Sequence, residues 1–240
     1  MILRRAKPKA PAQGATKPLL VAEGVVAVEG FRVATALIEA GRPSTDAGSM
    51  FHALATQAVQ QHFSRGRRGL AVCGASAGTG VTFTSACLAA ALAAAGAPVL
   101  LIETNLHQPS LMDLIRPDRP VNGLTDYLRG EASLVDVLQS EILPSLSVVF
   151  AGGKDSRGDE LLISQRFRQF LDDCLRDYAC VIVDTAPANR FADGRSVAIA
   201  VGYAAIVGRR QYSFINDTKL LARQLREAGV TVVGSIFNLA

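Results

Sequence analysis

The chain has 240 residues, of which 49% are hydrophobic, 19% charged and 6% aromatic. This length suits one α/β domain with a substantial core and is short for two, and the composition excludes a disordered or fibrous protein. The formal charge of +4 comes from 25 basic and 21 acidic residues. Residues 1–17 hold five of the basic residues and no acidic one, so the remaining chain is near neutral and a globally basic nucleic-acid surface is excluded.

The beginning of the chain differs in composition from the rest. Residues 1–18 are rich in proline, alanine and lysine, which predicts a disordered basic tail. This tail is either a solvated terminus or an electrostatic contact with anionic lipid. Residues 19–47 form an N-terminal extension of mixed strand-like and helix-like composition that we leave unassigned, and residues 48–240 are predicted to form one domain. No apolar segment marks a signal peptide or a membrane-spanning helix.

From residue 50 onward, apolar runs alternate with helical patterns. The predicted helices are, in chain order, Met50–His62, Gly80–Ala95, Glu160–Arg176 and Phe214–Ala228. The predicted strands between and after them are Leu70–Cys73, Val99–Glu103, Leu146–Phe150, Cys180–Asp184, Ala204–Val207 and Val230–Phe237. The strands are continuous apolar runs, which is typical of a mainly parallel sheet with helices on both faces. The predicted class is therefore α/β, with ligands expected at the carboxyl ends of the strands.

Two sets of side chains are expected to lie inside this domain. The last predicted helix has a face with helical spacing that is expected to be buried and consists of Phe214, Thr218, Leu221, Leu225 and Ala228. The four cysteines form no C-x-x-C pair and lie in apolar surroundings, so we interpret them as buried reduced thiols rather than zinc ligands or disulfide partners.

The loop after the first of these strands is rich in glycine and reads Gly74-Ala-Ser-Ala-Gly-Thr-Gly-Val-Thr82. A phosphate-binding loop needs glycines so that backbone N–H groups converge on the phosphates, a lysine for the β- and γ-phosphates, and Ser or Thr for Mg²⁺. Gly78, Gly80 and Thr82 fit this pattern, but Val81 occupies the lysine position. Taken alone, the loop is explained about as well by a tight strand-to-helix turn.

Polar side chains at two later strand ends strengthen the phosphate-binding interpretation. The strand at Val99–Glu103 ends in Glu103 and is followed by Asn105, and the strand at Cys180–Asp184 delivers Asp184 to the same edge, as a Walker B element does. The alternative for Asp184 is a cap on the turn before Pro187. If the site is retained, we expect Mg²⁺ to be held by Thr82, Glu103 and Asp184.

These elements resemble a known family. From about Met50 to Asn238 the sequence is similar to the cytoplasmic domain of bacterial polysaccharide co-polymerases and bacterial tyrosine kinases (BY-kinases), within the MinD/ParA group of P-loop ATPases. The resemblance is carried by the loop, the two strand ends and four further segments, Gly123–Leu134, Val149–Gly153, Asp159–Phe167 and Val233–Asn238. It implies a P-loop NTPase-like fold and assigns to Asn238 the asparagine that reads adenine in the family.

The site departs from the family pattern at several positions. Val81 replaces the loop lysine, Glu103 and Asn105 replace two aspartates, and the dipeptide 107–108, His-Gln, replaces an arginine pair. Lys154 is one of only two lysines after the tail, and we consider it as a substitute cation. The Walker A motif is therefore degenerate, and we expect weak nucleotide binding at most.

Features used for assembly and autophosphorylation in the kinases are also altered. The glutamate and two arginines of the ring-assembly helix read Ser49, His52 and Ala55, so we expect a monomer or dimer rather than a ring. The last tyrosine is Tyr212, which leaves no C-terminal tyrosine cluster.

The resemblance implies a role in exopolysaccharide or capsule synthesis and export, with a holdfast-type system as one setting. Our leading hypothesis is a catalytically degenerate pseudokinase that binds the cytoplasmic tails of an inner-membrane polysaccharide chain-length regulator. It would be cytoplasmic, with peripheral attachment at the inner membrane, would bind no nucleic acid and would require no cofactor, while weak ATP or ADP binding with Mg²⁺ stays open. The alternatives are an active protein-tyrosine kinase or ATPase with an atypical loop, and a partition-type ATPase, against which the segments 123–134 and 149–167 argue.

Overall fold

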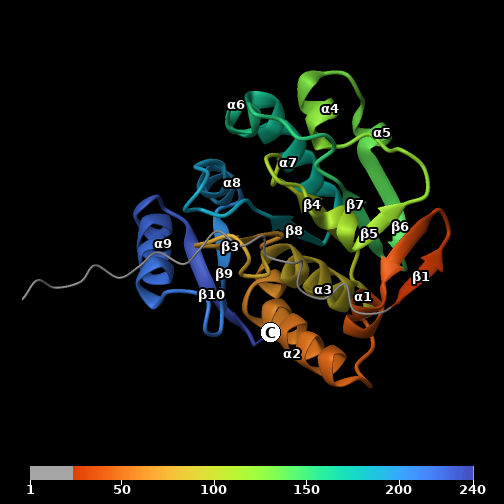
Figure 1. Ribbon diagram of the computed structural model, residues 1–240, viewed down its shortest axis with the longest axis horizontal. Helices are drawn as coiled ribbons and strands as arrows, with labels where there is room; N and C mark the ends of the chain where they lie inside the picture. The colour runs from red at the N-terminus through yellow and green to blue at the C-terminus, as the bar shows by residue number, and fades with distance from the viewer. Residues whose placement is uncertain (1–23, 240) are drawn as a thin grey trace, which may run out of the picture.

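A computed structural model describes residues 24–239 of the chain and has a seven-stranded sheet at its centre (Figure 1). In spatial order its strands are β10 (Thr231–Asn238), β9 (Tyr203–Arg209), β3 (Gly69–Gly74), β8 (Cys180–Asp184), β4 (Val99–Glu103), β7 (Leu146–Val149) and β6 (Leu138–Leu143). All neighbouring strands are parallel except β6 and β7. The predicted α/β class with a mainly parallel sheet is confirmed.

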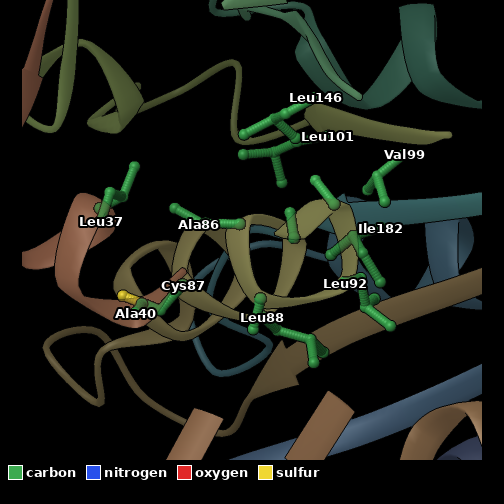
Figure 2. Packing of buried hydrophobic residues seen from close by; sticks show 14 of the residues in the cluster. Leu37, Ala40, Ala86, Cys87, Leu88, Leu92, Val99, Leu101, Leu146 and Ile182 are labelled. Carbon is green, nitrogen blue, oxygen red and sulfur yellow. The ribbon is translucent and has the colours of Figure 1, made fainter. Parts of the chain in front are cut away.

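One face of this sheet is covered by three helices, α1 (Thr35–Ala40), α2 (Asp46–Gln61) and α3 (Val81–Ala94). Helix α3 is apolar on all sides, as expected for a helix buried between the sheet, α1 and α2. Its small alanine side chains let these neighbours approach closely. Figure 2 shows α3 between the strands that carry Leu101 and Ile182 and the helix that carries Leu37 and Ala40. Its N-terminus is thereby held at the carboxyl edge of the sheet, where the glycine-rich loop enters it.

The other face is covered by the remaining α-helices, α4 (Leu124–Arg129), α5 (Leu134–Val137), α6 (Gly158–Ile163), α7 (Gln165–Asp177), α8 (Asp193–Val201) and α9 (Ile215–Glu227). Apolar residues of these helices form a second core cluster with the sheet. Phe167 and Phe170 of α7 are its largest fully buried side chains. Both faces of the central strands β3, β8, β4 and β7 are therefore buried, which agrees with the continuous apolar strands in the sequence.

A small antiparallel sheet stands beside the main one and consists of β1 (Val25–Val28), β2 (Phe31–Ala34) and β5 (Ile115–Pro117). Short 3₁₀ helices occur at η1 (Phe63–Arg65) and η2 (Leu111–Asp113). Val33, Leu37 and Ala40 are fully or almost fully buried in the same core cluster as α3. The described part of the unassigned segment 19–47 thus packs into the core, while the predicted tail 1–18 and its lipid contact lie outside the described residues.

Several elements of the structure differ from those predicted. The single helix predicted at Glu160–Arg176 is wrong, because Ser164 adopts extended backbone between α6 and α7 and caps α7 by accepting a hydrogen bond from the Phe167 N–H. The predicted burial of Phe214 and Ala228 is also wrong, since 70% of Phe214 is exposed and Ala228 is exposed too, while Leu221 and Leu225 are buried. Strand β6 and helix α8 were not predicted.

Two further predictions concern the state of the cysteines and the presence of a membrane-spanning helix. All four cysteines are free and buried, as expected. Within residues 24–239, no helix is both long and apolar enough to cross a membrane.

Candidate nucleotide site

The loop between β3 and α3 owes its path to two glycines with positive φ. Gly78 has φ of 78° and Gly80 has φ of 88°, and a Cβ on Gly80 would lie 2.5 Å from Nδ2 of Asn238. Gly80 is the N-cap residue of α3 and provides no side-chain cap, so the first N–H groups of the helix face the loop. This arrangement of loop and helix N-terminus is suited to phosphate.

Val81 places an apolar side chain inside this loop. The residue is 9% exposed and belongs to the core cluster around α3. Its Cγ2 atom packs against the start of the loop, where a Cβ on Gly74 would lie only 2.6 Å away. Lys154 is exposed, and no hydrogen bond or ion pair joins it to the loop within the described residues. Neither position therefore supplies a lysine ammonium group to the loop.

Asp184 lies at the carboxyl end of β8, in register with Glu103 on β4 and Val72 on β3. Its Oδ1 accepts a hydrogen bond from the Ser85 hydroxyl at 3.3 Å, whereas its buried Oδ2 has no hydrogen-bond partner. Burial, reinforced by the negative charge of Glu103, raises the pKa of Asp184 to about 8 despite the hydroxyls of Thr82 and Ser85. A Mg²⁺ ion beside Thr82 would satisfy this oxygen, so these two residues fit a metal.

Glu103 was predicted to be a metal ligand, but both of its carboxylate oxygens accept backbone hydrogen bonds. Its Oε1 accepts the backbone N–H groups of Ser110 at 2.6 Å and Leu111 at 2.7 Å, and its Oε2 accepts that of Ala151 at 3.1 Å. Burial raises the pKa of this carboxyl group, and the three hydrogen bonds partly oppose that effect. Glu103 thus ties the segment after β4 to the end of β7, although its charge still acts on Asp184.

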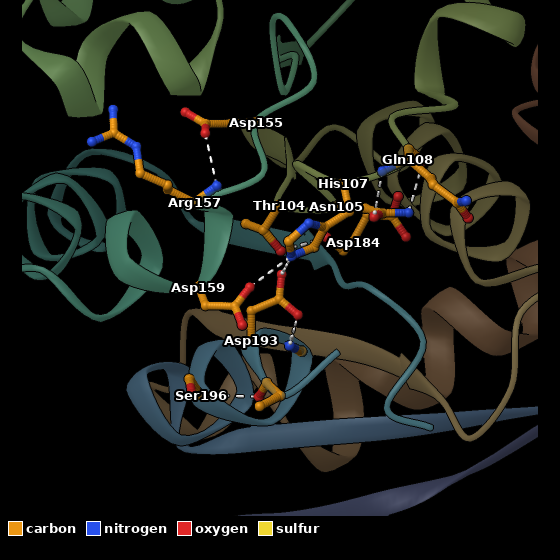
Figure 3. Close-up of polar contacts among 12 residues, drawn as sticks. Thr104, Asn105, His107, Gln108, Asp155, Arg157, Asp159, Asp184, Asp193 and Ser196 are labelled. Carbon is orange, nitrogen blue, oxygen red and sulfur yellow. Dashed lines mark hydrogen bonds and ion pairs between the residues drawn. The ribbon is translucent and has the colours of Figure 1, made fainter. Parts of the chain in front are cut away.

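The segment after β4 carries other predicted residues close to the loop. The Asn105 side chain closes a local turn, donating to the Gln108 carbonyl at 2.8 Å and accepting from the Gln108 N–H at 3.1 Å (Figure 3). The Ser110 hydroxyl donates to Thr82 Oγ1 at 3.1 Å. Asn105 therefore has a structural role here, and Thr82 is connected to this segment as well as to α3.

The structure brings three residues from the C-terminal part of the chain to the loop. Asn238, at the end of β10, donates to the Thr79 carbonyl at 3.3 Å. Arg209, at the end of β9, donates to the Gly78 carbonyl at 3.2 Å and lies over the ring of Tyr212, whose hydroxyl approaches Gly78. Sequence reasoning missed Arg209 and Tyr212, although Arg209 ends an apolar strand at the edge where ligands were expected.

Comparison with known proteins places this chain in a family, although no protein-family model matches it. EpsB of Ralstonia solanacearum is 33% identical over 165 residues, and the tyrosine-protein kinase Etk of Escherichia coli K12 is 32% identical over 169 residues. These matches cover 69% and 70% of this chain but only 22% and 23% of the relatives, so the chain spans about a quarter of their length or less.

The solved kinase domain of Escherichia coli ETK superposes with a TM-score of 0.76 and 30% identity, covering 84% of this chain and 79% of that one. The chain belongs to the BY-kinase domain family. A MinD cell-division ATPase of Pyrococcus furiosus shares the fold at a TM-score of 0.62 and 22% identity, with 72% of each chain covered. The resemblance to BY-kinase domains is therefore confirmed for fold and family, and the likeness to the MinD ATPase shows the fold alone.

Proposed function

We propose that this BY-kinase-like domain does not transfer phosphate and acts as a regulatory partner in exopolysaccharide or capsule synthesis. The observation that carries the proposal is Val81, whose methyl groups pack inside the loop at the lysine position. Loss of a charge-assisted contact weakens ordinary binding by about 1.5–3 kcal/mol. Loss of a cation that stabilises developing charge in phosphoryl transfer slows the reaction by ~10³–10⁵-fold.

Weak nucleotide binding remains part of this proposal. Mg²⁺, when bound, would neutralise phosphate charge. The residues proposed to contact nucleotide or Mg²⁺ surround one loop and its strand edge, and they are Gly78, Gly80, Val81, Thr82, Glu103, Asp184 and Asn238. Of the three proposed metal ligands, Thr82 and Asp184 are the better suited, because both Glu103 oxygens already accept backbone hydrogen bonds.

The polysaccharide setting is supported by the names of relatives. CpsD of Streptococcus agalactiae is described as a tyrosine-protein kinase and is 28% identical over 172 residues, which cover 74% of that protein. A relative from Klebsiella pneumoniae, 27% identical over 169 residues, is described by its place in a cps region. We infer that this chain binds the cytoplasmic tails of an inner-membrane chain-length regulator, at the cytoplasmic side of that membrane and as a monomer or dimer.

An active tyrosine kinase is the second candidate, and the relatives' names favour it, because Etk and CpsD are described as tyrosine-protein kinases. In this case Arg209 is the cation of interest, since its guanidinium group already contacts the loop at Gly78. The two candidates differ in one property, the ability of the natural chain to consume ATP.

Radiolabelled ATP turnover distinguishes them. The full chain is incubated with γ-labelled ATP and Mg²⁺, and released phosphate and phosphotyrosine are both measured. The proposal expects neither product above the level of an Asp184→Asn variant, which serves as the matched control for contaminating ATPases. Turnover by the natural chain that disappears in Asp184→Asn would overturn the proposal and establish the kinase or ATPase.

A further inference from the structure

A second polar cluster lies at the carboxyl edge of the sheet and combines one histidine with two aspartates (Figure 3). His107 follows β4, Asp159 lies in the first turn of α6, and Asp193 is the first residue of α8. Nε2 of His107 lies 2.7 Å from Oδ1 of Asp159 and 3.3 Å from Oδ2 of Asp193. One nitrogen and two carboxylate oxygens therefore converge from three separate segments, all within 4.8 Å of one another.

Asp193 is the member of the cluster that most needs a cation. Its side chain is fully buried, and its Oδ1 accepts the Gly194 N–H at 2.9 Å. Its Oδ2 points toward His107 but has no hydrogen-bond partner. A buried carboxylate oxygen without such a partner is costly, so the arrangement favours a positive charge at the centre of the cluster.

The orientation of His107 suits a metal ion. Its ring stacks on Phe191 with centroids 4.0 Å apart and planes 9° apart, which holds the plane of the ring, and its Nε2 faces both carboxylates. Zinc–nitrogen and zinc–oxygen bonds of about 2.1 Å place neighbouring tetrahedral ligands about 3.4 Å apart. The His107–Asp193 distance already matches, and the Asp159 side chain, which is 56% exposed, has room to move outward.

We propose that His107, Asp159 and Asp193 bind a divalent transition-metal ion of the Zn²⁺ class, at a site separate from the nucleotide loop. An imidazole nitrogen with two carboxylate oxygens suits Zn²⁺ better than Mg²⁺, which prefers an all-oxygen octahedral shell. Three protein ligands leave a fourth position for water. The bound ion joins the segment after β4 to α6 and α8, and so stabilises the carboxyl edge of the sheet.

Calorimetric titration with Zn²⁺ tests the site directly. The full chain is used after chelator treatment and without a histidine tag, because a tag would itself bind Zn²⁺. Residues 1–23 contain no histidine or cysteine and the four cysteines are buried, so these residues should not compete for the ion. We expect one ion per chain and, with Zn²⁺ at about 100 times its Kd, a rise in melting temperature of about 5–10 °C. A tenfold excess of Mg²⁺ should not reverse the rise.

Variants separate a metal site from a simple ion pair. Asp159→Asn should lose at least tenfold in Zn²⁺ affinity, while Asp172→Asn, an exposed aspartate on α7, should match the natural chain. His107→Arg places a permanent positive charge beside Asp193 and should remain folded without binding Zn²⁺. Absence of Zn²⁺ binding in the natural chain, or equal binding by Asp159→Asn, would overturn the proposal and leave an ion pair only.

Discussion

Val81 places two methyl groups at the loop position where the family has a lysine ammonium group. The Val81→Lys variant should bind ATP with Mg²⁺ roughly tenfold more tightly or better, because a charge-assisted contact exceeds the ~1.4 kcal/mol that corresponds to tenfold. Calorimetric titration of both proteins measures the change. Val81→Met is the matched control, since it adds length without charge and should give no gain. Equal affinity of the Val81→Lys and Val81→Met variants would show that the loop no longer shapes a phosphate site.

Asp184 should make stability depend on pH. Its pKa is about 8 in the fold and 3.8 in an unfolded chain, so between these values the folded chain holds a proton that the unfolded chain has lost. The resulting stabilisation is fully present below pH 3.8 and is lost as the pH rises toward 8. Relative to Asp184→Asn, the natural chain should therefore lose up to about 1.4 kcal/mol of unfolding free energy per pH unit in this window.

Urea unfolding at pH 5, 6, 7 and 8, with Mg²⁺ removed, measures this difference at about one-unit steps. The Asp172→Asn variant should run parallel to the natural chain at every pH. Parallel curves for Asp184→Asn and the natural chain would mean that Asp184 ionises normally and that its unpartnered oxygen is solvated.

Glu103 connects three backbone segments through one carboxylate, as its hydrogen bonds to Ser110, Leu111 and Ala151 show. Glu103→Ala should lower the free energy of unfolding by about 3 kcal/mol or more, because it leaves buried N–H groups without acceptors. Hydrogen exchange at the three amides should accelerate at the same time. Glu131→Ala, at an exposed glutamate, is the control. Unchanged protection at all three amides would show that the carboxylate is not what holds these segments.

Ser164 decides where one helix ends and the next begins. Ser164→Ala removes the acceptor of the Phe167 N–H and should cost about 1 kcal/mol of stability, the usual value for an N-cap. Urea unfolding measures the loss, and Ser156→Ala, in the exposed loop before α6, provides the comparison. A loss of the same size in both variants would argue against a specific cap.

The strands were easier to predict than the helix boundaries and the contacts of polar residues. Strands β4 and β8 have the predicted bounds, because each is an apolar run that ends in an acidic residue. The break at Ser164 was missed because the surrounding pattern is helical on both sides. The contacts of Glu103 and Arg209 depend on which segments meet at the sheet edge, and a pattern of residues along the chain does not contain that information.

At the level of the whole domain, the order of the elements was predicted better than the residue at which the domain begins. Residues 24–47 looked irregular because each apolar run there is short, yet Val33 and Leu37 are fully buried beside α3. Burial of such short runs depends on α2 and α3, which lie later in the chain. We therefore propose that the domain includes these residues rather than beginning at residue 48.

Helix α2 is the element on which the expectation about assembly rests. At the three positions of the family's ring-assembly motif, Ser49 donates to the Asp46 carbonyl, His52 Nε2 lies 3.2 Å from the Gly41 carbonyl oxygen, and Ala55 is 2% exposed. None of the three presents the carboxylate or guanidinium group that would bridge neighbouring subunits, so a head-to-tail contact through this helix lacks those charge pairs. We expect light scattering to give the mass of one or two chains at micromolar concentration, with or without ATP and Mg²⁺. A stable particle of eight chains would contradict this expectation and would place the assembly surface elsewhere on the domain.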